Sequence, residues 1–490
     1  MLNVVYFNQY FMKKNKLIEL LESIPKKEYN SISFFLESKA VNDNAKVFQL
    51  FNEIIRSKPN LKGEESNIFP KRKLFHCLYK DKPFDDDVFR KLMSTLVQKI
   101  EMYLVFKESQ NDQYFSKLTL LDYYRNKKLS KHFDGHFRFL EKRKKTASHD
   151  ANYFHSEFTR LSQYNRYVAE YKGRQFPRKY QEASNTLDQY FILEKLKICT
   201  VILTHKSISK TDYDFVFLEE IFSLLEKDST YLEIDSIKLF FIVIKIQLRR
   251  DDEKAFEDLK IQLAKNNNIG VEDLQDIYFI AFNYCVQKIN QGDSDYLGNL
   301  YELYKQALKN EILLINDKIS PWNYKNIVSV GLRMKDFDWV YKFIQNYKKR
   351  LDGPDAQNAF NYNLARYYFY IKEYKKLLEL LQVVEYSDVF YMLDSKTLLL
   401  KAYYETNELD AMHSLMDSFK QLLRRKKIIS DHHKTNYLNL VRFLKRLSQI
   451  NPRDKKRLIA LKKQIDESAQ IADKNWLLEK FEEKNKIYVK

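Results

Sequence analysis

Two histidines four residues apart are the first candidates for chemistry in this sequence. His132 and His136 would share one face of a helix, and two imidazoles at this spacing can bind one zinc ion. The residues between them are Phe133, Asp134 and Gly135, so the glutamate that acts as general base in the HExxH pattern is missing. Gly135 also weakens the helix that would align the two rings. We therefore expect no metal ion at this pair.

The other histidines and cysteines have no neighbours that could complete a metal site. His432 and His433 are adjacent and would point to different faces of a helix, and His76 and Cys77 have no further ligand types nearby. The three cysteines of the chain lie far apart: Cys77, Cys199 and Cys285. Such an odd and sparse set fits neither a disulfide framework nor a zinc motif, and it fits a reducing compartment. We expect no metal and no cofactor.

Catalytic signatures with a fixed spacing are also missing from the sequence. The eight glycines form neither a GxGxxG nor a GxxxxGK[ST] loop, the two patterns that cradle phosphates. No serine lies in a nucleophile elbow. We therefore expect a protein without catalytic activity. An enzyme whose site is assembled from distant residues stays open as a third alternative, because residues 1–180 carry no recognisable motif.

The composition predicts long helices with short connections. Hydrophobic residues make up 44% of the 490 residues and charged residues 31%, which is enough apolar material for a packed interior. Only 8 glycines and 8 prolines occur, whereas sheet-rich folds need turn residues every few positions. We therefore expect an all-α fold.

The N-terminus and the longest apolar run predict a soluble, cytoplasmic protein. The apolar stretch Leu2–Met12 precedes Lys13 and Lys14, which is the reverse of the order in a signal peptide. The longest wholly apolar run near the middle, Leu239–Ile244, is far shorter than a membrane span. We expect no membrane span. The oligomeric state is not predicted by any feature of the sequence.

Positive charge is concentrated toward both ends of the chain. The formal net charge is +18, with an excess of 11 basic side chains over residues 51–200 and of 12 over residues 301–490, whereas residues 201–300 carry an acidic excess of 7. Basic surfaces attract nucleic acid, acidic proteins or anionic lipid. A codon bias is an equally good explanation of the lysines, because Asn, Ile, Tyr and Phe are abundant too.

Four short basic clusters occur near predicted helix ends: Lys142–Lys145, Lys348–Arg350, Arg424–Lys427 and Lys455–Arg457. Cations at the carboxyl end of a helix stabilise its free carbonyls and remain solvated, so this structural role is the first interpretation. Contact with phosphates is the alternative.

The helical period is clearest over residues 84–107. Apolar side chains recur there at spacings of three and four: Phe89, Leu92, Met93, Leu96, Ile100, Tyr103 and Leu104. Three aspartates, residues 85–87, stand in the expected first turn, where carboxylates complement the helix dipole. Later in the chain, Thr211 is expected to cap a helix over residues 215–226.

Three regions follow from these patterns. A break at Gly173–Pro177 ends a helical N-terminal region, residues 1–180. Residues 181–430 show helix pairs. Residues 431–490 are expected to form closing helices that cover the exposed end of the stacked pairs.

The helix pairs repeat at a nearly constant offset. Ile327, Gly331, Phe337 and Val340 align with Leu364, Tyr368, Tyr374 and Leu377 at an offset of 37, and these align with Leu399, Tyr403, Leu409 and Met412 at an offset of 35. A helix pair that recurs about every 34 residues resembles the tetratricopeptide repeat (TPR). Residues 364, 365, 368 and 374 match that family's packing positions, whereas Lys372 replaces a glycine and Leu377 replaces an alanine.

The resemblance covers roughly residues 187–425 and is most specific over 321–425. It implies a right-handed superhelical stack of antiparallel helix pairs, a TPR-like α-solenoid. HEAT-like or other solenoid geometry stays open as an alternative.

The resemblance also implies a ligand groove. In TPR arrays the first helix of each pair lines the concave face, and its non-core positions meet the ligand. Carried over by position, these are Trp322 and Lys325, Tyr362 and Arg366, and Lys401 and Tyr404. Cations can meet carboxylates and rings can cover apolar side chains, so such a groove suits an extended acidic peptide. The Asn-rich clamp of chaperone-binding members is not present.

We therefore expect a non-catalytic interaction scaffold that binds a protein or an extended acidic peptide in this groove. The alternative is a nucleic-acid-binding protein that uses basic patches at both ends. A purely structural reading of the six groove positions, as a solvated helix face, stays open as well.

Overall fold

The computed structural model describes residues 16–56, 71–80, 82–111, 113–143, 148–171, 179–208, 211–249, 252–265, 268–353, 355–381, 389–426 and 429–486. Two compact units make up the chain: Met1–Ala147 with Asn152–Asp188, and Ser148–Ala151 with Gln189–Lys490. Several sequence features lie outside the described residues, namely the stretch Leu2–Met12, the break Gly173–Pro177, Lys144, Lys145 and Lys427.

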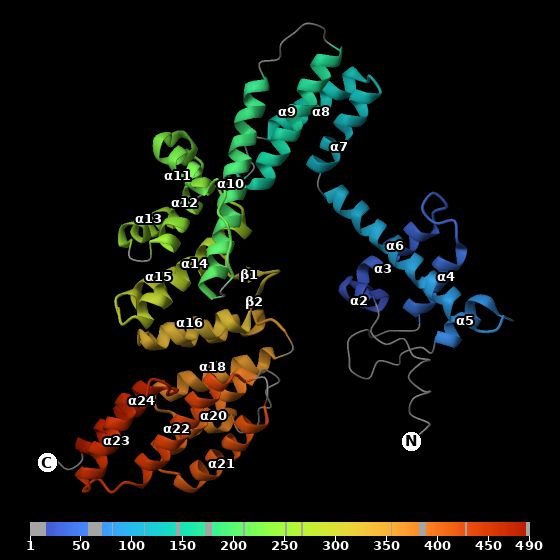
Figure 1. The fold of residues 1–490 in the computed structure, drawn as a ribbon. Coiled ribbons are helices and arrows are strands. Elements are labelled where there is room, and N and C mark those ends of the chain that lie inside the picture. Colours follow the sequence, from blue (N-terminus) through green and yellow to red (C-terminus); the bar gives the residue numbers. More distant parts are fainter. Residues whose placement is uncertain are drawn as a thin grey trace. The chain divides into compact units, whose positions relative to one another are not determined.

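Helices account for all regular structure in the described part of the first unit (Figure 1). They are α2 (Lys16–Ser23), the short 3₁₀ helix η1 (Lys26–Glu28), α3 (Tyr29–Glu37), α4 (Ala45–Arg56), α5 (Lys71–Tyr79), α6 (Asp86–Asn111), α7 (Gln113–Asn126), α8 (Ser130–Arg143) and α9 (Ala151–Tyr171). Helix α10 (Lys179–Ile208) begins in the first unit and continues into the second.

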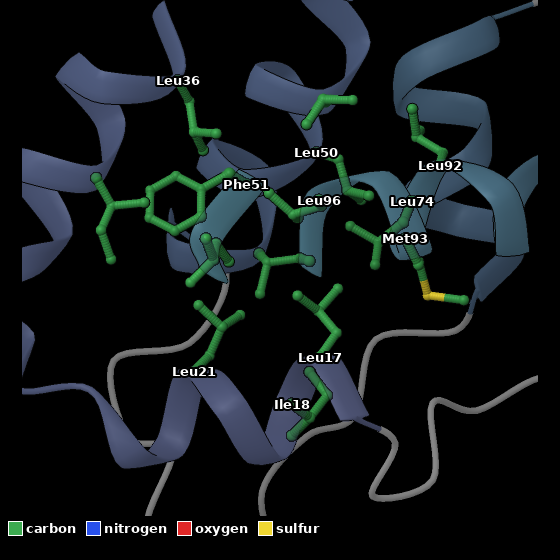
Figure 2. Close-up of a cluster of buried hydrophobic side chains, with 14 of the residues drawn as sticks. Leu17, Ile18, Leu21, Leu36, Leu50, Phe51, Leu74, Leu92, Met93 and Leu96 are labelled. Carbon is green, nitrogen blue, oxygen red and sulfur yellow. The ribbon is translucent and has the colours of Figure 1, made fainter. Parts of the chain in front are cut away.

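The helix predicted over residues 84–107 is α6, and its apolar period forms the core of the first unit. Phe89, Leu96 and Ile100 are fully buried. They pack in one cluster with side chains of α2 to α5, several of which Figure 2 shows pointing toward α6. The Asp85 carboxylate accepts hydrogen bonds from the backbone amides of Asp87 and Val88, so this aspartate caps the helix that follows it.

In its described residues, the second unit consists of packed helices, many of them in neighbouring pairs, and one short hairpin (Figure 1). Its elements before the specific repeats are α11 (Leu218–Lys227), η2 (Ser229–Glu233), α12 (Asp235–Leu248), α13 (Glu253–Leu263), α14 (Val271–Asn290), α15 (Tyr296–Lys309), and the strands β1 (Leu314–Ile315) and β2 (Lys318–Ile319). The strands pair antiparallel, with Leu314 opposite Ile319.

The helix pairs of residues 321–425, in which the repeat is clearest, and the closing helices follow. They are α16 (Pro321–Arg333), α17 (Phe337–Tyr347), η3 (Lys348–Arg350), α18 (Ala356–Tyr370), α19 (Tyr374–Leu381), α20 (Val389–Glu405), α21 (Leu409–Arg425), α22 (Asp431–Gln449), α23 (Lys455–Glu467) and α24 (Lys474–Lys486). Each of the pairs α16–α17, α18–α19 and α20–α21 packs together. The first helices α16, α18 and α20 pack in succession (Figure 1). The all-α prediction and the pairing of helices are confirmed.

The turn inside each specific pair has the same backbone geometry. Lys335, Lys372 and Asn407 all have positive φ, between 58° and 63°. The Lys335 amide donates to the Leu332 carbonyl and the next amide donates to the Gly331 carbonyl, as in a Schellman helix end. The same two bonds recur at the other turns. These positions are 37 and 35 residues apart, so the backbone repeats with the offsets that the sequence predicted.

Lys372→Gly is expected to stabilise the second unit by about 0.5–1 kcal/mol. A side chain costs energy in the left-handed region, whereas glycine adopts it freely. Urea unfolding followed by tryptophan fluorescence measures the effect in this unit, which holds all three tryptophans: Trp322, Trp339 and Trp476. The matched control is Lys375→Gly in α19, expected to destabilise by about 1 kcal/mol. Equal effects of the two substitutions would contradict the prediction.

The closing helices share one core with the last repeat. Leu440, Leu444 and Leu461 are fully buried in the cluster that also contains Met412 and Phe419 of α21. The side chain of Ser430 caps α22 by accepting from the His433 amide. Helices α22–α24 therefore complete the hydrophobic core of α20 and α21.

Candidate ligand-binding site

The candidate site lies on the first helices of three successive pairs, and local signals fix the first of these helices. Ser320 caps α16 through its hydroxyl, and Pro321 occupies the first helical position, as its rigid φ allows. The Tyr391 hydroxyl of α20 donates to the Pro321 carbonyl at 2.7 Å. This bond ties the third helix of the site to the start of the first.

Four of the six predicted groove residues line one cavity of about 260 Å³. They are Lys325, Tyr362, Arg366 and Lys401. The rest of the lining comprises Ser329, Phe369, Tyr370, Asp394, Thr397, Leu398, Tyr437, Ala472 and Asp473. The cavity therefore has three walls on α16, α18 and α20, and a fourth from α22 and the segment before α24.

The other two predicted residues lie beside the lining without belonging to it. Trp322 is 46% exposed, its ring lies 5.7 Å from the Tyr391 ring, and the Lys325 ammonium lies 5.2 Å from its ring centre. Tyr404 packs edge-on against Trp476 of α24 at 5.8 Å. Tyr404 therefore serves the packing of α24 against α20.

Two aspartates that were not predicted from the sequence pair with the two lysines of the cavity. Asp394 forms an ion pair with Lys325 and accepts a hydrogen bond from the Tyr437 hydroxyl at 3.1 Å. Asp473 pairs with Lys401 at 2.9 Å. The cavity therefore contains three cations and two carboxylates, and its formal charge is +1.

Arg366 is the cation without a carboxylate. Its Nη1 donates to the Ser329 hydroxyl, and its guanidinium lies 5.7 Å from the centre of the Tyr362 ring. Among the residues that the structure describes, no carboxylate lies within ion-pairing distance of Arg366. Burial opposes the charge on Arg366, and its neighbours, Tyr362 foremost, outweigh this effect so that the pKa is raised. The guanidinium is therefore always charged.

A second cavity of about 610 Å³ adjoins the first. Phe369, Tyr370, Lys401 and Asp473 line both. Trp476 lines the larger cavity, and its indole donates to the Glu405 carboxylate at 3.1 Å. The two cavities thus lie on either side of the same four side chains, and the larger one extends toward α24.

The histidine pair packs against an aromatic ring, and the two cysteines that follow Cys77 in the sequence are buried. The Tyr124 ring lies 5.4 Å from the ring of His132 and 5.0 Å from that of His136. Burial and the nearby Lys117 lower the pKa of His136. Cys77 is exposed, whereas burial raises the pKa of Cys285 to about 12. Within the described ranges, no three His, Cys, Asp or Glu side chains are grouped so as to hold a metal ion.

The basic clusters occupy different places on their helices. Arg424 and Arg425 end α21, where the predicted carboxyl-end role applies. Lys348–Arg350 forms the 3₁₀ helix η3. Lys455–Arg457 opens α23, so the predicted role is wrong for this cluster, because cations at an amino end oppose the helix dipole.

No protein-family model matches this chain, and no curated protein is similar to it. None of the helices in the described part of the chain is both long and apolar enough to cross a membrane. The cavity at Arg366 is consequently the feature on which a functional proposal rests.

Proposed function

We propose that the chain is a non-catalytic interaction scaffold whose helix pairs bind a protein or an extended acidic peptide along their inner face. The observation that carries the proposal is the convergence of Lys325, Arg366 and Lys401 on one cavity, from the first helices of three successive pairs. Cations presented at regular intervals along a stack suit an extended chain that carries acidic side chains. The exposed thiol of Cys77 fits a reducing compartment such as the cytoplasm.

The proposal includes a TPR-like architecture, in which the pairs form a right-handed superhelix with this face concave. The repeated offsets of 37 and 35 residues and the shared turn at Lys335, Lys372 and Asn407 support it. The larger cavity beside Trp476 offers room for residues that flank an acidic side chain of the ligand.

The ion pairs at the site are compatible with exchange for a ligand's carboxylate. The Asp473 side chain is 48% exposed, although its partner Lys401 is only 12% exposed. A partly exposed ion pair contributes about 0–1 kcal/mol, so Asp473 can release Lys401 at a small cost. An incoming carboxylate that takes the place of Asp473 regains that interaction.

A nucleic-acid-binding function is the second candidate, and one observation favours it. Lys455, Lys456 and Arg457 are exposed at the amino end of α23. The helix dipole disfavours cations there, and in the described part of the chain only Arg457 of the three has an ion pair at the helix end, with the capping Asp454 at 3.3 Å. Phosphate groups offer such a cluster a partner.

Fluorescence anisotropy on the full chain at low salt tests both candidates. The probes are a labelled acidic peptide, a basic peptide of equal length and a single-stranded oligonucleotide. We expect saturable binding of the acidic peptide alone, weakened about tenfold or more by Arg366→Gln, because a charge-assisted contact is lost. Arg442→Gln, which removes a charge from the exposed face of α22, is the matched control and is expected to leave binding unchanged.

Two outcomes would contradict the scaffold proposal. Equal affinity for the acidic and the basic peptide would mean that the site does not recognise the charge of its ligand. Binding of the oligonucleotide alone, lost in a Lys455→Gln, Lys456→Gln double variant, would instead favour the nucleic-acid function.

A further inference from the structure

The charge balance of the small cavity is incomplete by one anion. Lys325 is satisfied by Asp394 and Lys401 by Asp473. Arg366 has only the neutral Ser329 hydroxyl as a hydrogen-bond acceptor among the described residues. Arg366 is partly buried, and Asp394 and Asp473 act on its charge only from beyond ion-pairing distance, so a directly bound anion would stabilise it. Among the residues that the structure describes, Arg366 thus has no carboxylate partner of its own, which leaves its guanidinium available to an anion from outside the chain.

The surroundings of Arg366 are those of a receptor for an oxygen anion. A guanidinium has five N–H donors in a planar fork, and Ser329 uses one nitrogen of it. The side chains of Tyr362 and Tyr370 lie close enough to influence the ionisation of Arg366, and both line the cavity. Ser329 itself is held by its hydrogen bond to the Lys325 carbonyl at 2.7 Å, which fixes the acceptor that orients the fork.

The size of the cavity limits what can pair with Arg366. A volume of about 260 Å³ is below the roughly 300–1,000 Å³ typical of sites for whole small molecules. It has space for one phosphoryl or carboxylate group with a few attached atoms and water. The larger cavity then receives whatever is attached to that group, because the two cavities share Phe369, Tyr370, Lys401 and Asp473.

We propose that Arg366 is the anchor for a single oxygen anion, a phosphoryl or carboxylate group, that the ligand inserts into the cavity between Lys325 and Lys401. This inference rests on the proposed function and narrows it from a series of acidic side chains to one deeply bound anionic group. For this one group neither lysine has to release its aspartate, because both can stabilise the anion from each side at longer range. Arg366 supplies the direct contacts, in a planar arrangement that matches two oxygens of either group.

The test is isothermal titration of the full chain, in a buffer without other anions that compete, with inorganic phosphate and in parallel with acetate. Saturable binding of at least one probe at one site is expected. Arg366→Gln is expected to weaken binding about tenfold or more, and Arg442→Gln to leave it unchanged. Preference for phosphate identifies a phosphoryl ligand and preference for acetate a carboxylate ligand.

A gain-of-affinity variant separates loss of the site from loss of folding. Asp394→Asn raises the formal charge of the cavity from +1 to +2 and keeps the shape of the side chain. It is expected to tighten binding of the preferred probe about three- to tenfold. A misfolded protein cannot produce this result.

Each of these results either supports or contradicts the proposed role of Arg366 as the anchor of the anion. Absence of saturable binding of both probes to the wild-type chain overturns it, as does equal binding by Arg366→Gln. Failure of the anchor is distinct from failure of the scaffold: an acidic peptide that binds wild type and Arg366→Gln equally leaves a scaffold without this anchor. Conversely, phosphate or acetate binding that depends on Arg366, without any binding of the peptide, would support the anchor and contradict the peptide-binding function.

Discussion

Glu157→Ala is expected to lower the free energy of unfolding of the first unit by about 3–5 kcal/mol. Glu157 and Arg160 of α9 form an ion pair at 2.9 Å with side chains only 2% and 1% exposed. Removing the carboxylate leaves a guanidinium buried without a counter-charge, and its Nη1 already lacks a hydrogen-bond partner. The Tyr114 hydroxyl, which donates to Glu157 at 3.0 Å, loses its acceptor as well.

The measurement uses two probes of unfolding in urea. Circular dichroism follows both units, whereas tryptophan fluorescence reports on the second unit, which contains every tryptophan of the chain. We expect Glu157→Ala to shift the unfolding of the first unit to lower urea concentration, which circular dichroism detects. The unfolding transition that tryptophan fluorescence follows is expected to stay in place. The matched control replaces both partners, Glu157→Leu with Arg160→Met, and is expected to be near neutral because no charge stays buried. A cost below about 1 kcal/mol for Glu157→Ala would contradict a structural role of the pair.

Gly331→Ala is expected to destabilise the second unit by about 1–3 kcal/mol, although alanine is the better helix former by about 1 kcal/mol. A Cβ atom at this position would lie 2.5 Å from the Cγ2 atom of Val340 and 3.4 Å from Cζ3 of Trp339. Val340 is fully buried, so it has no free space into which it can move. Urea unfolding followed by tryptophan fluorescence measures the loss.

Gly298→Ala in α15 is the control for the helix-forming tendency alone. Nothing lies within 4 Å of a Cβ atom built at Gly298. This substitution is expected to stabilise the same unit by up to about 1 kcal/mol. Opposite signs for the two glycines are the expected result, and equal signs would mean that the contact of Gly331 with Val340 does not decide its stability.

The helical period and the repeat offset could be predicted because they depend on neighbours in sequence. Burial of Phe89, Leu96 and Ile100 follows from spacing alone. Strict use of the offsets would also have found Asp394, which stands 72 residues after Trp322, at the same position of the third pair. The same offsets bring Lys325, Tyr362 and Thr397 to one level of the cavity, and Ser329, Arg366 and Lys401 to another.

Other features depend on contacts that spacing does not encode. Thr211 does not cap the helix expected over residues 215–226, because α11 begins only at Leu218. Phe217 precedes it with a φ of 68°, a conformation that no local pattern around an aromatic residue predicts. Asp473 reaches Lys401 only because α23 and α24 pack back toward α20, which is a property of the closing helices and lies outside the repeat.

Because α22 and the segment before α24 form one wall of the cavity, the affinity for the proposed ligand would depend on how firmly the last helices are docked. Tyr437 and Asp473 are in place only while these helices pack on α20 and α21. Binding and docking are then thermodynamically linked, so an occupant of the cavity holds the C-terminal helices closed. By the same reciprocity, a substitution that loosens α24 weakens binding without touching the cavity itself.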